Sequence, residues 1–142
     1  MSRRDSYHNI VKRALIDDGW IITHDPYTFD WEDKLEPTLS TDLGAERTIG
    51  AERGVEKIAV EVKSFLSVSQ IVDLQKAIGQ YVIYRALLRK REPERVIYLA
   101  VPSYAFYNIL ATEVGKAAIE AASLKLIVFF VEEEKELLWR TE

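Results

Sequence analysis

Two short runs of almost uninterrupted apolar residues constrain the fold of this chain more than any other feature. One run covers residues 96–101 and the other residues 125–131. A strand that is apolar on both sides is typical of a sheet whose two faces are both covered. Between the runs, residues 102–122 show the spacing of a helix. We therefore expect an α/β fold in which a mixed central sheet is flanked by helices.

The rest of the chain supplies further predicted elements. Apolar residues recur at helical spacing between Tyr7 and Leu15, which predicts a helix that begins near Asp5 and ends before Gly19. The other expected elements are a short strand (20–23), a hairpin of two strands (41–52 and 55–64), a long helix (69–90) and a last edge strand (137–139). An irregular aromatic stretch separates the first strand from the hairpin.

Length and charge limit the classes of protein to which the chain can belong. With 142 residues there is room for a single domain, residues 1–142, and not for separate catalytic and binding domains. The absence of cysteine excludes disulfide scaffolds, thiolate zinc sites and cysteine nucleophiles. A formal net charge of −4 argues against nonspecific coating of nucleic acid. There is no signal-peptide pattern and no apolar run of the roughly 20 residues that cross a bilayer, so we expect a cytoplasmic location and no membrane contact.

Charge is nevertheless unevenly distributed along the chain. Basic residues gather between positions 85 and 95, and acidic residues gather between positions 132 and 142. Such clusters are more often solvated charges at helix ends and tails than binding patches. A local basic surface for nucleic acid stays open as the alternative.

Two charged residues at the end of a predicted strand are the first indication of a functional site. The segment Ile58-Ala59-Val60-Glu61-Val62-Lys63 is otherwise apolar. Because side chains alternate along a strand, Glu61 and Lys63 share one face, while Val60 and Val62 share the other. Burial of the two charges is costly unless they pair with each other or bind a ligand. For this motif alone, a surface ion pair is the simple alternative.

Acidic residues on the partner strand of the hairpin extend this pattern. If the chain turns at Arg53-Gly54, Glu46 lies opposite Glu61 and Asp42 lies near Lys63. Carboxylates this close repel one another, and Mg²⁺ reverses the repulsion because it prefers one or two carboxylates, a carbonyl and water as ligands. We therefore expect Asp42 and Glu61 to converge on a divalent cation, whereas Glu46 is more simply a solvated charge.

This arrangement resembles the core of the PD-(D/E)xK nuclease superfamily, in which an acid on one hairpin strand precedes an acid and a lysine on the next. The resemblance implies that Asp42 and Glu61 hold Mg²⁺ or Mn²⁺ and that the backbone carbonyl of Val62 adds a ligand. It also implies that Lys63 orients or activates the attacking water. The catalytic residues of such a DNA endonuclease would be Asp42, Glu61 and Lys63.

Further positions resemble auxiliary residues of the same superfamily. Gln80 and Tyr84 lie four apart on one face of the predicted long helix and resemble the Q-x-x-x-Y motif of RecB-like nucleases. That motif implies contacts with nucleic acid or support of the metal site, and a plain polar pair on a helix is the alternative. His8 borders the apolar face of the first helix, where related nucleases carry an auxiliary histidine or acid. A histidine satisfied at the edge of the core is the commoner reason for such a position.

Nearly the whole chain is similar to the XisH-like proteins of cyanobacteria, which are factors that control excision of the fdxN element. The similar stretches are residues 4–8, 41–46, 56–65 and 74–81. Thr41 departs from the superfamily pattern, which has proline before the aspartate. The resemblance implies a nuclease-like fold and a role in DNA rearrangement. It also implies three partners, namely DNA, a companion excision-control protein and a site-specific recombinase.

Two functions are compatible with these residues. The first is an enzyme that cleaves DNA phosphodiester bonds with the help of Mg²⁺. The second is a catalytically silent module that keeps the nuclease-like fold and binds the companion factor and DNA without cleavage. The acidic net charge and the small size of the chain motivate the second. Self-association into a homo-oligomer is left open.

Overall fold

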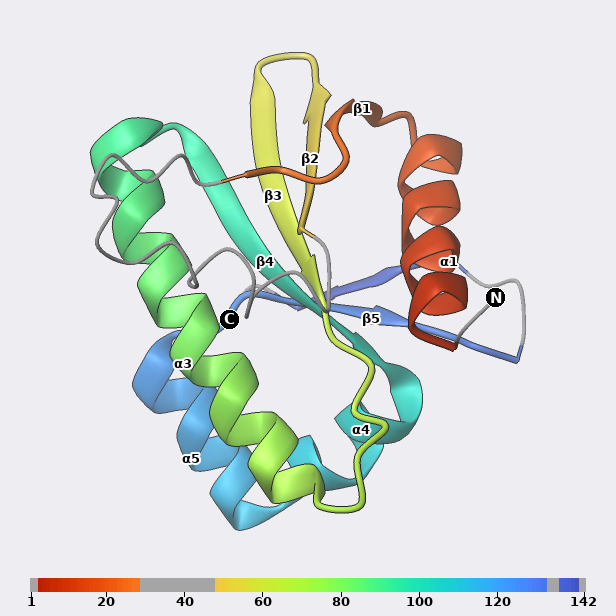
Figure 1. Cartoon of the computed structure of the whole chain (residues 1–142), viewed down its shortest axis with the longest axis vertical. Helices are drawn as coiled ribbons and strands as arrows, with labels where there is room; N and C mark the ends of the chain where they lie inside the picture. Colours follow the sequence, from red (N-terminus) through yellow and green to blue (C-terminus); the bar gives the residue numbers. More distant parts are fainter. Residues whose placement is uncertain (1–2, 29–47, 133–135, 141–142) are drawn as a thin grey trace.

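The strands form one mixed sheet at the centre of the fold (Figure 1). The computed structural model describes residues 3–28, 48–132 and 136–140. Its six strands are β1 (Ile21–His24), β2 (Thr48–Arg53), β3 (Glu56–Val62), β4 (Arg95–Pro102), β5 (Leu126–Phe129) and β6 (Leu138–Arg140). The strands lie side by side in chain order. The pairs β3·β4 and β4·β5 are parallel, and the other neighbouring pairs are antiparallel.

Helices cover both faces of this sheet. The described helices are α1 (Arg3–Asp17), α3 (Gln70–Arg91), α4 (Ser103–Tyr107), the short 3-10 helix η2 (Ile109–Ala111) and α5 (Glu113–Ala122). Helix α1 packs on one face, whereas α3 and α5 pack on the other (Figure 1). The α/β class predicted from the sequence, with a mixed sheet between helices, is therefore confirmed. No helix in the described segments is long and apolar enough to cross a membrane.

The alternation of side chains along β3 divides the core into two parts. Ile58, Val60 and Val62 belong to the cluster that packs against α1. Ala59 belongs to the cluster that packs against α3. Because the side-chain period of a strand is two, Glu61 is directed to the same face as Ala59. The charged end of β3 therefore points toward α3.

Sequence signals at both ends of α3 explain its length. Ser69 is the N-cap, and its hydroxyl accepts a hydrogen bond from the backbone N–H of Val72 at 3.4 Å. Three basic residues occupy the last turn, where positive charge is favoured by the helix dipole. The long helix predicted over residues 69–90 is thus confirmed to within one residue at each end.

The hairpin of β2 and β3 turns one residue later than predicted. Its two loop residues are Gly54 and Val55. Gly54 has a φ of +61°, which glycine adopts without steric cost and which the first position of a tight hairpin turn requires. When the turn moves by one residue, the partner of each residue on the opposite strand moves by two positions. Thr48 therefore lies opposite Glu61. The prediction that Glu46 lies there is wrong.

The helix predicted over residues 102–122 is interrupted. The structure has α4, η2 and α5 in its place. Asn108 breaks the helical path because its backbone has a φ of −111° and a ψ of −91°. Thr112 then starts α5 as its N-cap, with its hydroxyl accepting from the backbone N–H of Gly115 at 3.0 Å. The interruption gives α4 its own direction at the end of β4.

Gly115 in α5 and Gly79 in α3 are helical glycines with opposite surroundings. A Cβ atom on Gly115 would lie 2.2 Å from the carbonyl oxygen of Ile109, whereas a Cβ on Gly79 would meet no atom within 4 Å. We expect Gly115→Ala to destabilise the protein by roughly 1–3 kcal/mol because η2 must move away. Gly79→Ala should instead stabilise it by about 0.5–1 kcal/mol through a lower backbone entropy of the unfolded chain. Urea unfolding measures both changes, and a stabilised Gly115→Ala variant would contradict the close approach of α5 to η2.

Candidate functional site

Glu61 and Lys63 meet on the α3 face of the sheet, as their spacing predicts. The Nζ atom of Lys63 lies 3.3 Å from Oε1 of Glu61. Glu61 is only 1 % exposed, so this charged residue belongs to the interior and is not half of a surface pair. A buried carboxylate must be matched by nearby positive or hydrogen-bonding groups, because desolvation of an uncompensated charge costs several kcal/mol. The two residues therefore form one polar unit.

Helix α3 brings both members of its predicted motif to this unit. Lys63 donates a hydrogen bond from Nζ to Oε1 of Gln80. Tyr84, one turn later, is buried, and burial together with the negative charge of Glu61 raises the pKa of its hydroxyl above the usual value. Tyr84 hence stays protonated at neutral pH and close to the carboxylate. Two motifs that are 17 or more residues apart in sequence thus lie side by side.

Some of the oxygen atoms at the end of β3 are of the types that bind a divalent cation. The backbone N–H of Lys63 donates to the carbonyl of Ala100 on β4 at 2.9 Å. Because neighbouring residues of a strand direct their backbone groups to opposite sides, the carbonyl of Val62 points to the β2 side of β3. A carboxylate and a carbonyl are the ligand types that Mg²⁺ prefers. Glu61 and Val62 therefore fit two positions of the expected ligand set.

The third expected ligand, Asp42, lies outside the described residues, so its convergence with Glu61 stays a prediction. Within residues 3–28, 48–132 and 136–140, no three histidine, cysteine, aspartate or glutamate side chains gather closely enough to hold a metal ion. Thr48, which the sequence did not single out, is the described residue opposite Glu61 on β2.

His8 is held by a partner that sequence reasoning missed. Its Nε2 atom lies 2.8 Å from Oδ1 of Asp25, and Nζ of Lys12 lies 2.7 Å from Oδ2 of the same carboxylate. His8 is buried on α1, which packs on the opposite face of the sheet from α3. This matches the simple alternative of a satisfied histidine at the edge of the core. The sequence carried no signal for Asp25, because the contact joins α1 to the residue after β1 and depends on how these two elements pack.

The predicted basic cluster is divided between two roles. Arg95 is 4 % exposed and is bound by Glu92, whose Oε1 lies 2.8 Å from its Nε. Arg85 donates to the carbonyl of Ala122 at 2.5 Å and so joins α3 to α5. Only the last turn of α3, with Arg89, Lys90 and Arg91, keeps its basic residues together and exposed. The cluster is therefore partly structural.

A family model, "XisH: XisH protein", matches residues 1–137. The chain belongs to the XisH family. The resemblance found in the sequence is therefore confirmed over nearly its whole length. No curated protein matches the chain.

Two solved structures are similar to this XisH chain. One is an XisH family protein from Nostoc punctiforme PCC 73102, which is 40% identical, with a TM-score of 0.80 over 94% of this chain and 98% of that one. The other is a fdxN element excision controlling factor protein from Anabaena variabilis, also 40% identical, with a TM-score of 0.80 over 95% of this chain and 98% of that one. This chain shares their fold over 94–95% of its length.

The contacts of Asp25 predict a dependence of stability on pH. Burial favours a higher pKa for this carboxyl, but the hydrogen bond from Lys12 and the charge of His8 outweigh it, so the pKa lies below its usual value. A lowered pKa in the folded state stabilises the protein above the unfolded-state value of about 3.9, and this stabilisation is lost as the pH falls through the folded-state pKa. Asp25→Asn should therefore cost about 1–3 kcal/mol at pH 7, with the difference from the wild type shrinking in acid.

Urea unfolding of the wild type and the Asp25→Asn variant at a series of pH values measures this effect. Asp17→Asn is the matched control, because Asp17 is an exposed residue at the end of α1. It should change stability by no more than about 0.5 kcal/mol. Equal losses from Asp25→Asn at pH 7 and at the acid limit would show that the ionised carboxylate is not what stabilises the fold.

Proposed function

We propose that this XisH protein is a DNA-rearrangement factor that takes part in controlled excision of a chromosomal element. The support is its family membership together with its 40% identity, over nearly all of both chains, to a protein described as a fdxN element excision controlling factor. In this role the protein would bind DNA and act beside a companion excision-control protein and a site-specific recombinase. We place it in the cytoplasm, where the chromosome of a bacterium lies.

We further propose that the protein cleaves a DNA phosphodiester bond in a reaction that depends on Mg²⁺ or Mn²⁺. The observation that carries this proposal is the meeting of Glu61 and Lys63 from β3 with Gln80 and Tyr84 from α3. These groups come from two separate nuclease-like motifs that the fold brings together on one face of the sheet.

In such a site, each residue would have a separate role. Glu61 and the carbonyl of Val62 would hold the cation together with Asp42. A bound Mg²⁺ ion would lower the pKa of a water molecule and stabilise charge that develops on the phosphate. Lys63, whose ammonium group has three donors, would hold the attacking water or a phosphate oxygen beside Glu61.

Gln80 would act as a positioning residue for DNA. Its Oε1 atom accepts the hydrogen bond of Lys63. The amide of glutamine carries its two donors on Nε2, so the same side chain can donate to a phosphate oxygen without releasing Lys63. Tyr84 stays protonated and supports the carboxylate from the next turn of α3.

A catalytically silent module is the second candidate, and the burial of the site favours it. Glu61 is 1 % exposed, and its partner Lys63 has only 14 % of its side chain exposed. Such a pair is also stable as a structural ion pair inside a protein that binds DNA and its companion factor without cleavage. The two candidates differ in one measurable property, namely hydrolysis.

Nicking of supercoiled plasmid DNA in the presence of Mg²⁺ tests the enzymatic proposal. We expect the wild type to nick the plasmid and Lys63→Met to slow the reaction about a hundredfold or more, as loss of a charge-stabilising donor does in other enzymes. Lys57→Met is the matched control. Lys57 lies at the other end of β3 from Lys63, and its Nζ atom lies 3.9 Å from Glu94 and 4.0 Å from Glu92.

Both variants are first compared with the wild type by thermal unfolding, so that a folding defect is not mistaken for a loss of chemistry. Nicking by Lys63→Met at the wild-type rate would refute the assignment of Lys63. A folded wild type that binds plasmid DNA and never nicks it with Mg²⁺ or Mn²⁺ would support the silent module.

Calorimetric titration with Mn²⁺ tests the metal site without any need for cleavage. Asp42→Asn and Glu61→Gln should each weaken binding of the cation by about tenfold or more, since each removes a charged ligand. Glu56→Gln is the control, because Glu56 lies at the exposed start of β3. Unchanged Mn²⁺ affinity in the Asp42→Asn variant would remove Asp42 from the ligand set.

A further inference from the structure

A pocket on another part of the sheet is lined by aromatic residues and a carboxylate. It has a volume of about 340 Å³, at the lower end of the range of small-molecule sites. Its walls come from three places, with Tyr7 on α1, Tyr104 and Tyr107 on α4, and Phe130 and Glu132 after β5. The pocket lies where the parallel strands β4 and β5 end, which is the usual position of ligand sites in open α/β sheets.

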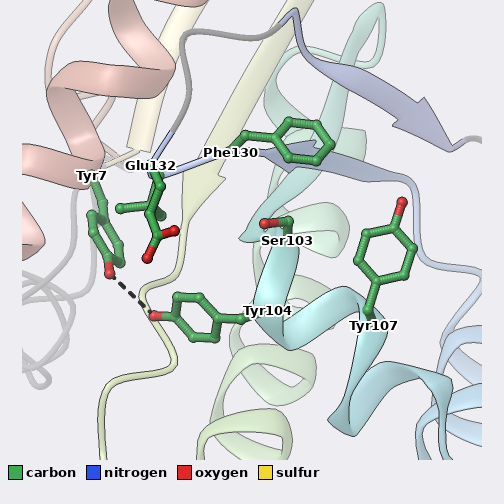
Figure 2. A pocket seen from close by; sticks show the side chains of 7 residues that line it. Tyr7, Ser103, Tyr104, Tyr107, Phe130 and Glu132 are labelled. Atoms are coloured by element: carbon green, nitrogen blue, oxygen red, sulfur yellow. Dashed lines mark hydrogen bonds between the residues drawn. The ribbon is translucent and has the colours of Figure 1, made fainter.

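Two hydroxyl groups in this pocket, those of Tyr7 and Tyr104, are arranged as acceptors. Tyr104 donates its proton to the backbone carbonyl of Ser64, and a carbonyl can only accept. The hydroxyl of Tyr7 lies 3.4 Å from that of Tyr104 (Figure 2). Because Tyr104 has a single proton and gives it to Ser64, the proton between the two hydroxyls belongs to Tyr7. The phenol protons of Tyr7 and Tyr104 are therefore used within the protein, so a ligand meets lone pairs on these two oxygens. The hydroxyls of Ser103 and Tyr107, which also line the pocket, can donate or accept.

The charges of the residues that line the pocket also favour a cation as the ligand. Figure 2 shows the rings of Tyr104, Tyr107 and Phe130 around a common space, with the carboxylate of Glu132 directed toward Tyr7 and Tyr104. Glu132 is exposed, and the described lining contains no lysine or arginine. Aromatic rings attract cations over their faces, and they do so more strongly where water is excluded. Acceptors, π faces and one negative charge together select a positively charged donor.

We propose that this pocket binds an organic cation, namely an alkylammonium or guanidinium group, with Glu132 as its counter-ion and Tyr104 and Tyr107 as aromatic walls. The group could belong to a free small molecule or to a lysine or arginine side chain of a partner protein, because the recognition chemistry is the same. The proposal does not depend on the nuclease-like site, since it uses none of that site's side chains.

Arg3 distinguishes a cation from a nucleotide as the ligand. Burial and the hydrogen bond with Tyr7 raise the pKa of Tyr104, and the positive charge of Arg3, in the first turn of α1, opposes this rise. The residue is exposed, and solvent and salt weaken its repulsion of a bound cation. A nucleotide phosphate would gain affinity from Arg3, whereas a cation would lose some. Arg3→Ala should therefore strengthen cation binding slightly and weaken nucleotide binding.

NMR titration of the full chain tests the proposal with choline, its neutral analogue 3,3-dimethyl-1-butanol, and the peptide Gly-Arg-Gly with blocked ends. We expect choline or the peptide to shift the amide signals of the pocket residues, and the neutral alcohol to bind at least about tenfold more weakly. Tyr107→Leu and Glu132→Gln should each weaken binding of the cation by about threefold to tenfold. Tyr107 is 59% exposed, so its replacement leaves the core intact. Glu120→Gln, at an exposed site on α5, is the matched control for charge.

The outcomes distinguish three ligands, namely a free organic cation, a cationic side chain of a partner protein, and nucleic acid. Tighter binding of choline supports a free small molecule, and tighter binding of the peptide supports a side chain of a partner protein. Equal binding of choline and the neutral alcohol would overturn the proposal, as would the absence of any shift at the pocket. Binding of a single-stranded oligonucleotide at the same residues, weakened by Arg3→Ala, would also overturn it and assign the pocket to nucleic acid.

Discussion

The position of β3 inside a sheet that is covered on both faces is the constraint on which the candidate site depends. An edge strand could direct a glutamate and a lysine into water, but β3 has β2 on one side and β4 on the other, with helices above and below. Glu61 therefore has to be matched inside the protein. Lys63 pairs with it, and Gln80 in turn accepts a hydrogen bond from Lys63. The buried charge at the end of β3 therefore requires polar residues at the facing positions of α3.

Helix α3 is held firmly enough to serve this purpose. Tyr81, next to Gln80, donates its hydroxyl proton to the carbonyl of Ile97 at 3.2 Å and accepts from the backbone N–H of Lys125 at 3.1 Å. One buried side chain thereby joins the helix to β4 and to the residue before β5. Since a functional group acts well only when the element that carries it is rigid, Tyr81 explains how Gln80 can be placed reproducibly over Lys63.

The sequence was sufficient for those features that depend on local patterns. Periodicity located α3 and the apolar strands, and the alternation in β3 correctly placed Glu61 and Lys63 on one face. The sequence was not sufficient to locate the hairpin turn, because a shift of one residue in the turn changes which residues face each other across the two strands. A turn at Gly54-Val55 instead of Arg53-Gly54 changes the cross-strand partner of Glu61, yet both dipeptides contain the same glycine. The contact between His8 and Asp25 joins elements whose relative placement is set by tertiary packing, so no local pattern encodes it.

Ser64 connects the nuclease-like site with the aromatic pocket. Its carbonyl accepts the proton of Tyr104, its hydroxyl lies 3.4 Å from Nε of Arg4 on α1, and it directly follows Lys63 in the chain. A ligand that displaces Tyr104 would therefore act on the backbone next to Lys63, and a change in the backbone at Lys63 would reach the pocket by the same route. Because binding free energies are reciprocal, any such effect must operate equally in both directions. The segment that follows β3 is therefore common to both regions.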